Sequence, residues 1–293
     1  MSFNTSKVLP PDGKYVLVTG ASSGLGRSCA FHLARVGFQV FAGVRTSAAG
    51  DELVGDDTTG RVNPVRLDVT DDESVAAAVK EITAAVGDTG LWALVNNAGV
   101  AVSAPLECVT PDRMRYQLDT NVIGQLRVTQ SVLPLLRRSR GRIVNVTSGL
   151  GSVALPFLGA YAAAQFAKEA MSDVLRRELR QFGIQVSVVQ PGAIMTPIWA
   201  KLSQGARSAL DDLPEETVAP YSVAFGRFLE LNEQGARDST TRPEDFARTV
   251  VRALTSVSAR TRYQVGKDAR TLSVLRRALP DRALDRRLRP ITQ

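Results

Sequence analysis

The chain of 293 residues is 44% hydrophobic and 22% charged, which is enough for one large domain over residues 1–293. Its formal net charge of +7 arises at the end of the chain, where residues 260–293 carry ten Lys/Arg against three Asp/Glu, so the preceding residues sum to about zero and we expect no nucleic-acid partner. The two cysteines, Cys29 and Cys108, lack CxxC spacing, which excludes a disulfide framework and a zinc site and fits a cytoplasmic location. No stretch approaches the roughly 20 apolar residues that span a bilayer.

Short apolar runs rich in β-branched residues alternate with helical patterns along the chain. The first run, KYVLVTG, is followed by Cys29, Leu33 and Val36 at helical spacing, which predicts a strand, a tight turn and a helix. Further strands are predicted over residues 38–43, 64–67, 91–96, 142–147, 184–190 and 262–266. We therefore predict an α/β fold, a single doubly wound Rossmann-type parallel sheet with helices on both faces. Such a sheet binds ligands at the carboxyl ends of its strands.

A glycine-rich turn, TGASSGLG, follows the first predicted strand over residues 19–26. Gly20, Gly24 and Gly26 allow positive φ, close approach of the backbone to a pyrophosphate and tight packing of the next helix, whose amino end offers free N–H groups to the anion. Placed between the first strand and the first helix of an α/β chain, this turn predicts dinucleotide binding.

The end of the second predicted strand bears on the choice of dinucleotide. An acidic residue there would bond the ribose 2′-hydroxyl of NAD(H) and repel a 2′-phosphate. This chain has Val44 and then Arg45 at that point, with no carboxylate. That favours NADP(H); NAD(H) stays an alternative, in which Arg45 is merely solvated.

Together these motifs resemble the short-chain dehydrogenase/reductase (SDR) family from about Lys14 to Thr196, with further similarity at RYQVG. The family's serine and tyrosine match Ser148 and Tyr161, which lie thirteen residues apart as the family has them, and its helix asparagine matches Asn121. Within the family, FAKEAMSDVLRRELRQFGIQVSVVQPG is most similar to the 17β-hydroxysteroid and retinol dehydrogenases. The resemblance implies these residues at the cofactor: Gly20, Ser22, Ser23, Gly24, Leu25, Gly26, Arg45, Asp68, Val69, Asn97, Ala98, Gly99, Tyr161, Gln165, Pro191, Gly192, Ile194 and Thr196.

The family signature YxxxK reads YAAAQ here, so Gln165 stands where the resemblance implies a lysine. That lysine bonds the nicotinamide ribose and stabilises phenolate; a unit charge about 4 Å away, at an effective dielectric near 20, is worth about 4 kcal/mol, or roughly three units of tyrosine pKa. Gln165 supplies hydrogen bonds but no charge. Three interpretations stay open. The enzyme works with Gln165, or Gln165 inactivates it, or Lys168, about 60° around the helix and about 4.5 Å further along, reaches back to replace the lysine.

The resemblance implies hydride transfer between a nicotinamide and a lipophilic ketone or secondary alcohol, as in the NAD(P)-dependent alcohol dehydrogenases. Ser148 would hold the carbonyl oxygen, Tyr161 would donate or accept the proton, and Asn121 would hold a water in the proton path. Because Gln165 leaves the phenol pKa high, reduction should survive better than oxidation. Two alternatives are a redox-silent dinucleotide-binding homologue, acting as a sensor or partner subunit, and a non-redox enzyme such as a dehydratase. Homodimers or homotetramers through the helices of Asn121 and Tyr161 are also implied.

Two segments surround this expected site. We predict a substrate lid over about residues 192–235, with an irregular start up to about residue 218 and with apolar residues at helical spacing that would pack as a helix pair over the sheet edge. Residues 268–293 read as a basic amphipathic tail kinked at Pro280, which either packs on the body or makes weak contact with a membrane surface. The only histidine, His32, cannot form a metal site alone, and we expect no metal.

Overall fold

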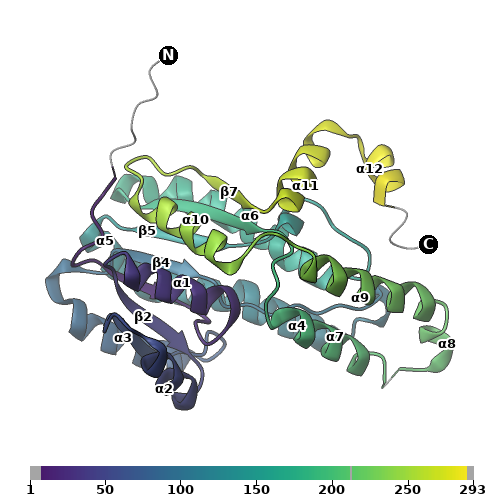
Figure 1. The fold of residues 1–293 in the computed structure, drawn as a ribbon, viewed down its shortest axis with the longest axis horizontal. Helices are drawn as coiled ribbons and strands as arrows, with labels where there is room; N and C mark the ends of the chain where they lie inside the picture. The colour runs from purple at the N-terminus through teal and green to yellow at the C-terminus, as the bar shows by residue number, and fades with distance from the viewer. Residues whose placement is uncertain (1–7, 212, 289–293) are drawn as a thin grey trace.

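The strands form one parallel sheet in the computed structural model, which describes residues 8–211 and 213–288. Their order is β3-β2-β1-β4-β5-β6-β7 (Figure 1). Their bounds are β1 (Tyr15–Val18), β2 (Gln39–Val44), β3 (Val62–Arg66), β4 (Ala93–Asn96), β5 (Arg142–Val146), β6 (Gln185–Pro191) and β7 (Arg262–Val265). The doubly wound sheet is confirmed, and the predicted strand boundaries lie within two residues of the observed ones.

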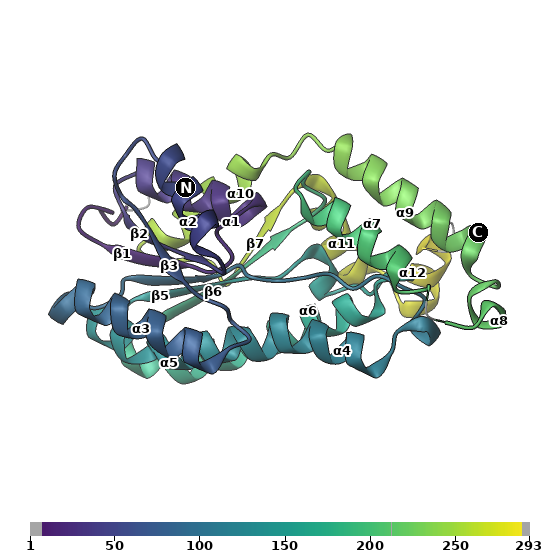
Figure 2. The same ribbon diagram turned by 90° about the horizontal axis from the view of Figure 1, so that it is seen from below.

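Helices cover both faces of the sheet (Figure 2). One face carries α1 (Gly24–Arg35), α2 (Ser47–Asp56) and α10 (Pro243–Thr255); the other carries α3 (Asp72–Val86), α5 (Gly124–Ser139) and α6 (Gly159–Glu178). The reason lies in the strands, whose successive side chains point to opposite faces. In β1, Val16 and Val18 join the core cluster beneath α1, whereas Leu17 joins the cluster on the opposite face.

The strand order reverses between β1 and β4. β1 pairs with β2 on one side and with β4 on the other, with Val18 opposite Val95. The loops that leave these two strands therefore diverge to opposite faces of the sheet and leave a crevice at its carboxyl edge. The predicted glycine turn follows β1, and the segment NNAG, residues 96–99, starts at the last residue of β4, so both lie at this reversal.

Helices also stand over the carboxyl edge of the sheet: α4 (Pro111–Leu118), α7 (Ile198–Ser208), α8 (Glu215–Val218) and α9 (Ser222–Arg237). The expectation of irregular structure up to residue 218 was wrong for α7 and α8. Ile198, Leu202 and Ala206 recur every four residues, so α7 has an apolar stripe, and Leu202 and Ala206 are buried in one cluster with Phe225 and Phe228 of α9. The expected helix pair is present.

The carboxyl-terminal region forms α11 (Lys267–Ala278) and α12 (Asp281–Leu288), which are separated at Pro280 as predicted. α11 packs on the segment after β5, where a Cβ added to Gly149 would lie 3.2 Å from the Ala269 Cα. Leu284 of α12 is buried. The described part of the tail thus packs on the body, while residues 289–293 of the predicted tail lie outside the described residues. None of the helices described here has the length and apolar character to cross a bilayer.

Candidate active site

The glycine turn between β1 and α1 is packed so tightly that larger residues do not fit. Gly20 and Gly24 have φ of +64° and +56°, values that favour glycine. A Cβ on Gly26 would lie 2.2 Å from the Gly20 carbonyl oxygen and 2.5 Å from Asn97 Nδ2. Without side chains at these points, the backbone and the amino end of α1 are open to an anionic ligand.

The NNAG segment after β4 holds this turn in place. Asn97 Nδ2 donates to the carbonyl oxygens of Thr19 and Gly20, at 3.0 and 3.1 Å. The backbone N–H groups of Asn97 and Ala98 donate in turn to Thr19 Oγ1, at 3.0 and 2.9 Å. These bonds fix the two loops to each other at the strand reversal.

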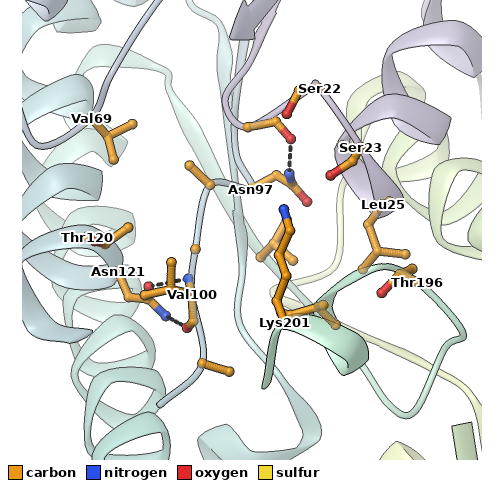
Figure 3. A pocket seen from close by; sticks show the side chains of 18 of the residues that line it. Ser22, Ser23, Leu25, Val69, Asn97, Val100, Thr120, Asn121, Thr196 and Lys201 are labelled. Atoms are coloured by element: carbon orange, nitrogen blue, oxygen red, sulfur yellow. Dashed lines mark hydrogen bonds between the residues drawn. The ribbon is translucent and has the colours of Figure 1, made fainter. Parts of the chain in front are cut away.

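Asn121 lies in a π-helical segment, Asp119–Ile123, between α4 and α5. Its Oδ1 accepts the Val100 N–H at 2.8 Å and its Nδ2 donates to the Val100 carbonyl at 3.0 Å (Figure 3). Both ends of the amide are therefore committed to one backbone residue of the loop after β4. The side chain is buried and lines the central pocket, and such π-helical insertions are frequent at functional sites.

Ser148 lies two residues after the end of β5 and Tyr161 lies in the first turn of α6, so the fold brings the two hydroxyls of the predicted pair together. Ser148 Oγ accepts the Leu150 N–H at 3.1 Å, which closes the turn after the strand. Burial raises the pKa of Tyr161, and an interaction with the Ser148 hydroxyl offsets part of this rise. The phenol is therefore protonated at neutral pH and can donate a proton.

Gln165, one turn after Tyr161, is almost completely buried, with 2% of its surface exposed. It lines the same pocket as Tyr161. Its Oε1 has no hydrogen-bond partner in the part of the chain that the structure describes. A buried acceptor left unpaired costs stability, so this amide is poised to bind a ligand that carries hydroxyl donors.

The central pocket is a cavity of about 540 Å³ at the carboxyl edge of β1 and β4. Of the residues expected at the site, these line it: Gly20, Ser22, Ser23, Gly24, Leu25, Gly26, Arg45, Asp68, Val69, Asn97, Ala98, Gly99, Asn121, Tyr161, Gln165, Pro191 and Thr196. Ser148, Gly192 and Ile194 do not. The Ile194 side chain is buried in the core, and Asp268 of α11 lies where a Gly192 side chain would be and accepts the Ala193 N–H at 2.6 Å.

Arg45 and Asp68 lie together in the pocket wall after β2 and β3. Burial alone would raise the pKa of Asp68, but hydrogen bonds from Thr70 and the charge of Arg45 hold it below its ordinary value. The Asp68 carboxylate accepts both the N–H and the hydroxyl of Thr70, at 3.0 and 2.7 Å. This part of the wall thus offers one cation and one fixed carboxylate.

A model of the short chain dehydrogenase family matches residues 14–207 of this chain. The chain belongs to that family. A 3-amino-tetrahydro-pyrrolizinone reductase of Xenorhabdus hominickii is 46% identical over 261 residues, 89% of this chain and 89% of that protein. Human 17-beta-hydroxysteroid dehydrogenase type 6 is 39% identical over 284 residues (93% and 88%), and mouse retinol dehydrogenase 5 is 37% identical over 282 residues (94% and 88%). The predicted likeness to hydroxysteroid and retinol dehydrogenases is confirmed.

The solved structure of a short chain dehydrogenase from Burkholderia cenocepacia, in complex with NADP, superposes on the structure of this chain with a TM-score of 0.72. The two are 27% identical, and the match covers 96% of this chain and 99% of the other. The fold is thus that of a dinucleotide-binding dehydrogenase.

Several residues that line the pocket of the present chain were not predicted from its sequence, because they come from the helices above the sheet edge. They include Arg113 and Tyr116 of α4 and Lys201 of α7. Lys201 extends across the pocket toward Asn97 (Figure 3), and Arg113 Nη2 donates to the Ser208 carbonyl at 2.8 Å, which holds the end of α7. Neither position carries a local signal, because only the packing of α4 and α7 brings them to the pocket.

An aromatic cluster that involves α9 lies next to the pocket without lining it. The ring centroid of Phe157 lies 5.3 Å from that of Phe225 and 5.2 Å from that of Phe228. Tyr161 packs against the cluster that contains these rings. No group of three or more His, Cys, Asp or Glu side chains in residues 8–211 and 213–288 could hold a metal ion.

Proposed function

We propose that this chain is an NADP(H)-dependent oxidoreductase that reduces a lipophilic ketone to a secondary alcohol more readily than it oxidises the alcohol. The observation that carries the proposal is the pairing of the Tyr161 phenol with the Ser148 hydroxyl, with Tyr161 in the wall of the glycine-lined pocket and against an aromatic cluster. The similarity to hydroxysteroid and retinol dehydrogenases supports a bulky apolar substrate.

The residues present fit a phosphorylated dinucleotide. The tight turn at Gly20 and Gly26 would receive a pyrophosphate, Arg45 would receive a 2′-phosphate, and the unpaired Gln165 Oε1 would accept from a ribose hydroxyl. When bound, the nicotinamide supplies or takes the hydride. The Burkholderia cenocepacia structure with NADP supports the same class of cofactor here.

The chain's own residues would manage the substrate oxygen and its proton. Ser148, which lies beside Tyr161 although it does not line the pocket, would donate a hydrogen bond to the carbonyl oxygen. The protonated phenol of Tyr161 would donate a proton to the alkoxide as it forms. Asn121, held at both ends by Val100, keeps the floor of the pocket rigid. The aromatic cluster of Phe157, Phe225 and Phe228 excludes water from the apolar part of the substrate.

Two observations favour a second candidate, a redox-silent protein that binds the dinucleotide as a sensor or partner subunit. Gln165 lacks the charge of the family's lysine, and the pKa of Tyr161 is raised by burial. A non-redox enzyme that uses the same tyrosine would show the same two features. All three proposals require the dinucleotide pocket and differ in turnover.

Turnover separates these candidates. The absorbance of NADPH should fall when the protein is mixed with apolar cyclic ketones, and it should fall more slowly or not at all with small polar ketones. The matched measurement is a fluorescence titration of NADPH. Tight binding without turnover across the panel would favour the redox-silent candidate, and no binding of NADPH or NADH would refute the whole proposal.

Arg45 should decide between the two dinucleotides. In Arg45→Asp, the affinity for NADPH should fall by about 10- to 100-fold, because a charge-assisted hydrogen bond is worth about 1.5–3 kcal/mol, while the affinity for NADH should hold or rise. Fluorescence titration of both dinucleotides measures this, with Arg66→Asp, on the exposed end of β3, as the control. If wild type and Arg45→Asp showed the same preference between NADPH and NADH, Arg45 would be a solvated side chain with no role in the choice of dinucleotide.

The remaining expectations concern assembly and location. Exposed apolar side chains at Ile123, Phe166 and Val174 lie along the segment before α5 and along α6, which supports the proposed homodimer or homotetramer through these helices. A cytoplasmic location and weak contact of the basic tail with a membrane surface stay predictions. The free thiols of Cys29 and Cys108, both buried, are consistent with the former.

A further inference from the structure

Lys168 is among the most deeply buried large side chains of the protein, with 2% of its surface exposed. It lies on α6, three residues after Gln165, and it lines the same pocket as Gln165 and Tyr161. Its ammonium makes no hydrogen bond or ion pair within residues 8–211 and 213–288. An unpaired lysine buried at a pocket wall is the kind of group that marks a functional site.

The neighbouring acid does not neutralise it. Glu169 Oε1 accepts from Thr147 Oγ1 at 2.7 Å and from Gln190 Nε2 at 2.8 Å, and its Oε2 accepts from Arg262 Nε at 2.9 Å. The carboxylate is therefore already committed to β5, β6 and β7. Within the described residues, Glu169 thus acts on Lys168 through its charge, without an ion pair between them.

Helix geometry places Lys168 on the face of Tyr161. Seven residues turn the helix through about 700°, only about 20° short of two full turns, and advance it about 10.5 Å. Long side chains on a helix lean back toward its amino end, so the four-carbon stem of Lys168 brings its ammonium back toward the level of Gln165. An ammonium can thus reach the region that a lysine at position 165 would serve.

We propose that Lys168 replaces the charge of the missing lysine, supplying positive charge to the nicotinamide end of the pocket beside Gln165. The inference rests on the proposed function. It selects the third of the interpretations that the sequence left open. Gln165 would then hydrogen-bond the ribose and Lys168 would provide the charge. The two functions of the family's lysine would thus be shared by two residues on successive turns of α6.

Burial lowers the pKa of Lys168 from its ordinary value of 10.5 to about 8, although the charge of Glu169 opposes the shift. The other ionisable groups that face this region are Arg262 beside Glu169, Tyr161 on α6, and Arg45, Asp68, Arg113, Tyr116 and Lys201 in the pocket lining. Lys168 should therefore lose its charge as the pH rises through about 8. Its contribution to dinucleotide affinity should decrease over the same pH range.

The first test is dinucleotide affinity against pH, which needs no turnover. NADPH titrated by fluorescence should bind wild type about tenfold more weakly at pH 9.5 than at pH 7, a loss of order one charge contact. Lys168→Met should bind weakly and without this pH dependence. The exposed Lys80→Met of α3 serves as the charge-matched control and should follow wild type.

The second test is rescue. At NADPH concentrations below the wild-type Kd, ketone reduction by Lys168→Met at pH 7 should fall about tenfold, in line with the lost affinity, and the double variant Gln165→Lys/Lys168→Met should recover at least wild-type turnover, because the ammonium then stands at the family's own position. Thermal melting checks that each variant is folded.

The stability of the fold should also depend on Lys168. The pKa of Lys168 is lower in the folded than in the unfolded protein, so the unfolded state binds more protons between about pH 8 and 10.5. The free energy of unfolding of wild type should therefore rise across that range, and that of Lys168→Met should not.

The outcomes separate the two proposals. If wild type binds NADPH and turns over ketones but Lys168→Met keeps its affinity, pH profile and rate, the role of Lys168 is refuted and the proposed function stands. If wild type binds neither dinucleotide, the proposed function fails first and takes the role of Lys168 with it. A Lys168→Met protein that loses activity without rescue by Gln165→Lys shows a structural role only, and overturns the inference.

Discussion

Replacing Tyr161 by Phe should lower ketone reduction by about 10²- to 10⁴-fold, the usual contribution of a positioned general acid. The ring stays in place against the apolar cluster of Phe157, so packing is kept and only the hydroxyl is lost. The affinity for NADPH should change little, because the tight turn at Gly20 and Gly26 and the charge of Arg45 are untouched. The measurement is steady-state turnover with NADPH alongside a fluorescence titration.

Tyr15→Phe is the matched control for this result. Tyr15 lies at the amino end of β1, away from the carboxyl edge that carries the site, and its ring stacks on Phe41 at 5.7 Å. Turnover of Tyr15→Phe should equal that of wild type. If Tyr161→Phe also retained full turnover, the phenol would not be the proton donor, and a non-redox or redox-silent role for the pocket would gain weight.

Replacing Gln165 by Lys should favour oxidation of the alcohol more than reduction of the ketone. Burial raises the pKa of Tyr161, so in wild type the phenol can give up a proton to a developing alkoxide but is seldom ionised to receive one. An ammonium about 4 Å away at an effective dielectric near 20 is worth about 4 kcal/mol, or roughly three units of that pKa. We expect the oxidation rate at pH 8 to rise by at least about tenfold, with a smaller change in reduction.

The pH dependence of the oxidation and reduction rates tests the ionisation of the Tyr161 phenol more directly. The alkaline rise of oxidation in wild type, which reports phenol ionisation, should move to lower pH in Gln165→Lys, while the profile of reduction should move little. Gln165→Met, which fills the space without charge, should give no gain in either direction. If Gln165→Lys raised the rates of oxidation and reduction equally, the claim that Gln165 impairs oxidation more than reduction would be wrong.

Much of the fold could be predicted from the sequence, because its signals are local. The apolar runs before Gly20 and Asn97 predict strands by composition and length, and the spacing of Ser148 and Tyr161 predicts their meeting once the strand before the serine and the helix that carries the tyrosine are assigned. The kink at Pro280 is local as well, since proline cannot continue a helix. The start of the lid was misjudged, because the apolar stripe of α7 becomes meaningful only against α9.

The pocket wall was harder to predict. Gly192 and Ile194 were placed at the cofactor by resemblance, yet Asp268 closes over the first and the core takes the second. Arg113 and Lys201 carry no local signal, and their place in the wall depends on how α4 and α7 cross the sheet edge. Such contacts join residues far apart in the chain, so no short pattern records them.

The amino-acid sequence by itself determined the parallel sheet, the glycine turn and the tyrosine that faces it, because strand period, turn geometry and helix spacing are properties of a few consecutive residues. Only the tertiary structure decided what surrounds Gln165. The burial of Lys168 and the commitment of Glu169 to Arg262 depend on β5, β6 and β7 packing against α6. Desolvation and pairing are set by neighbours in space: burial lowers the pKa of Lys168, and the charge of Glu169 opposes part of that shift.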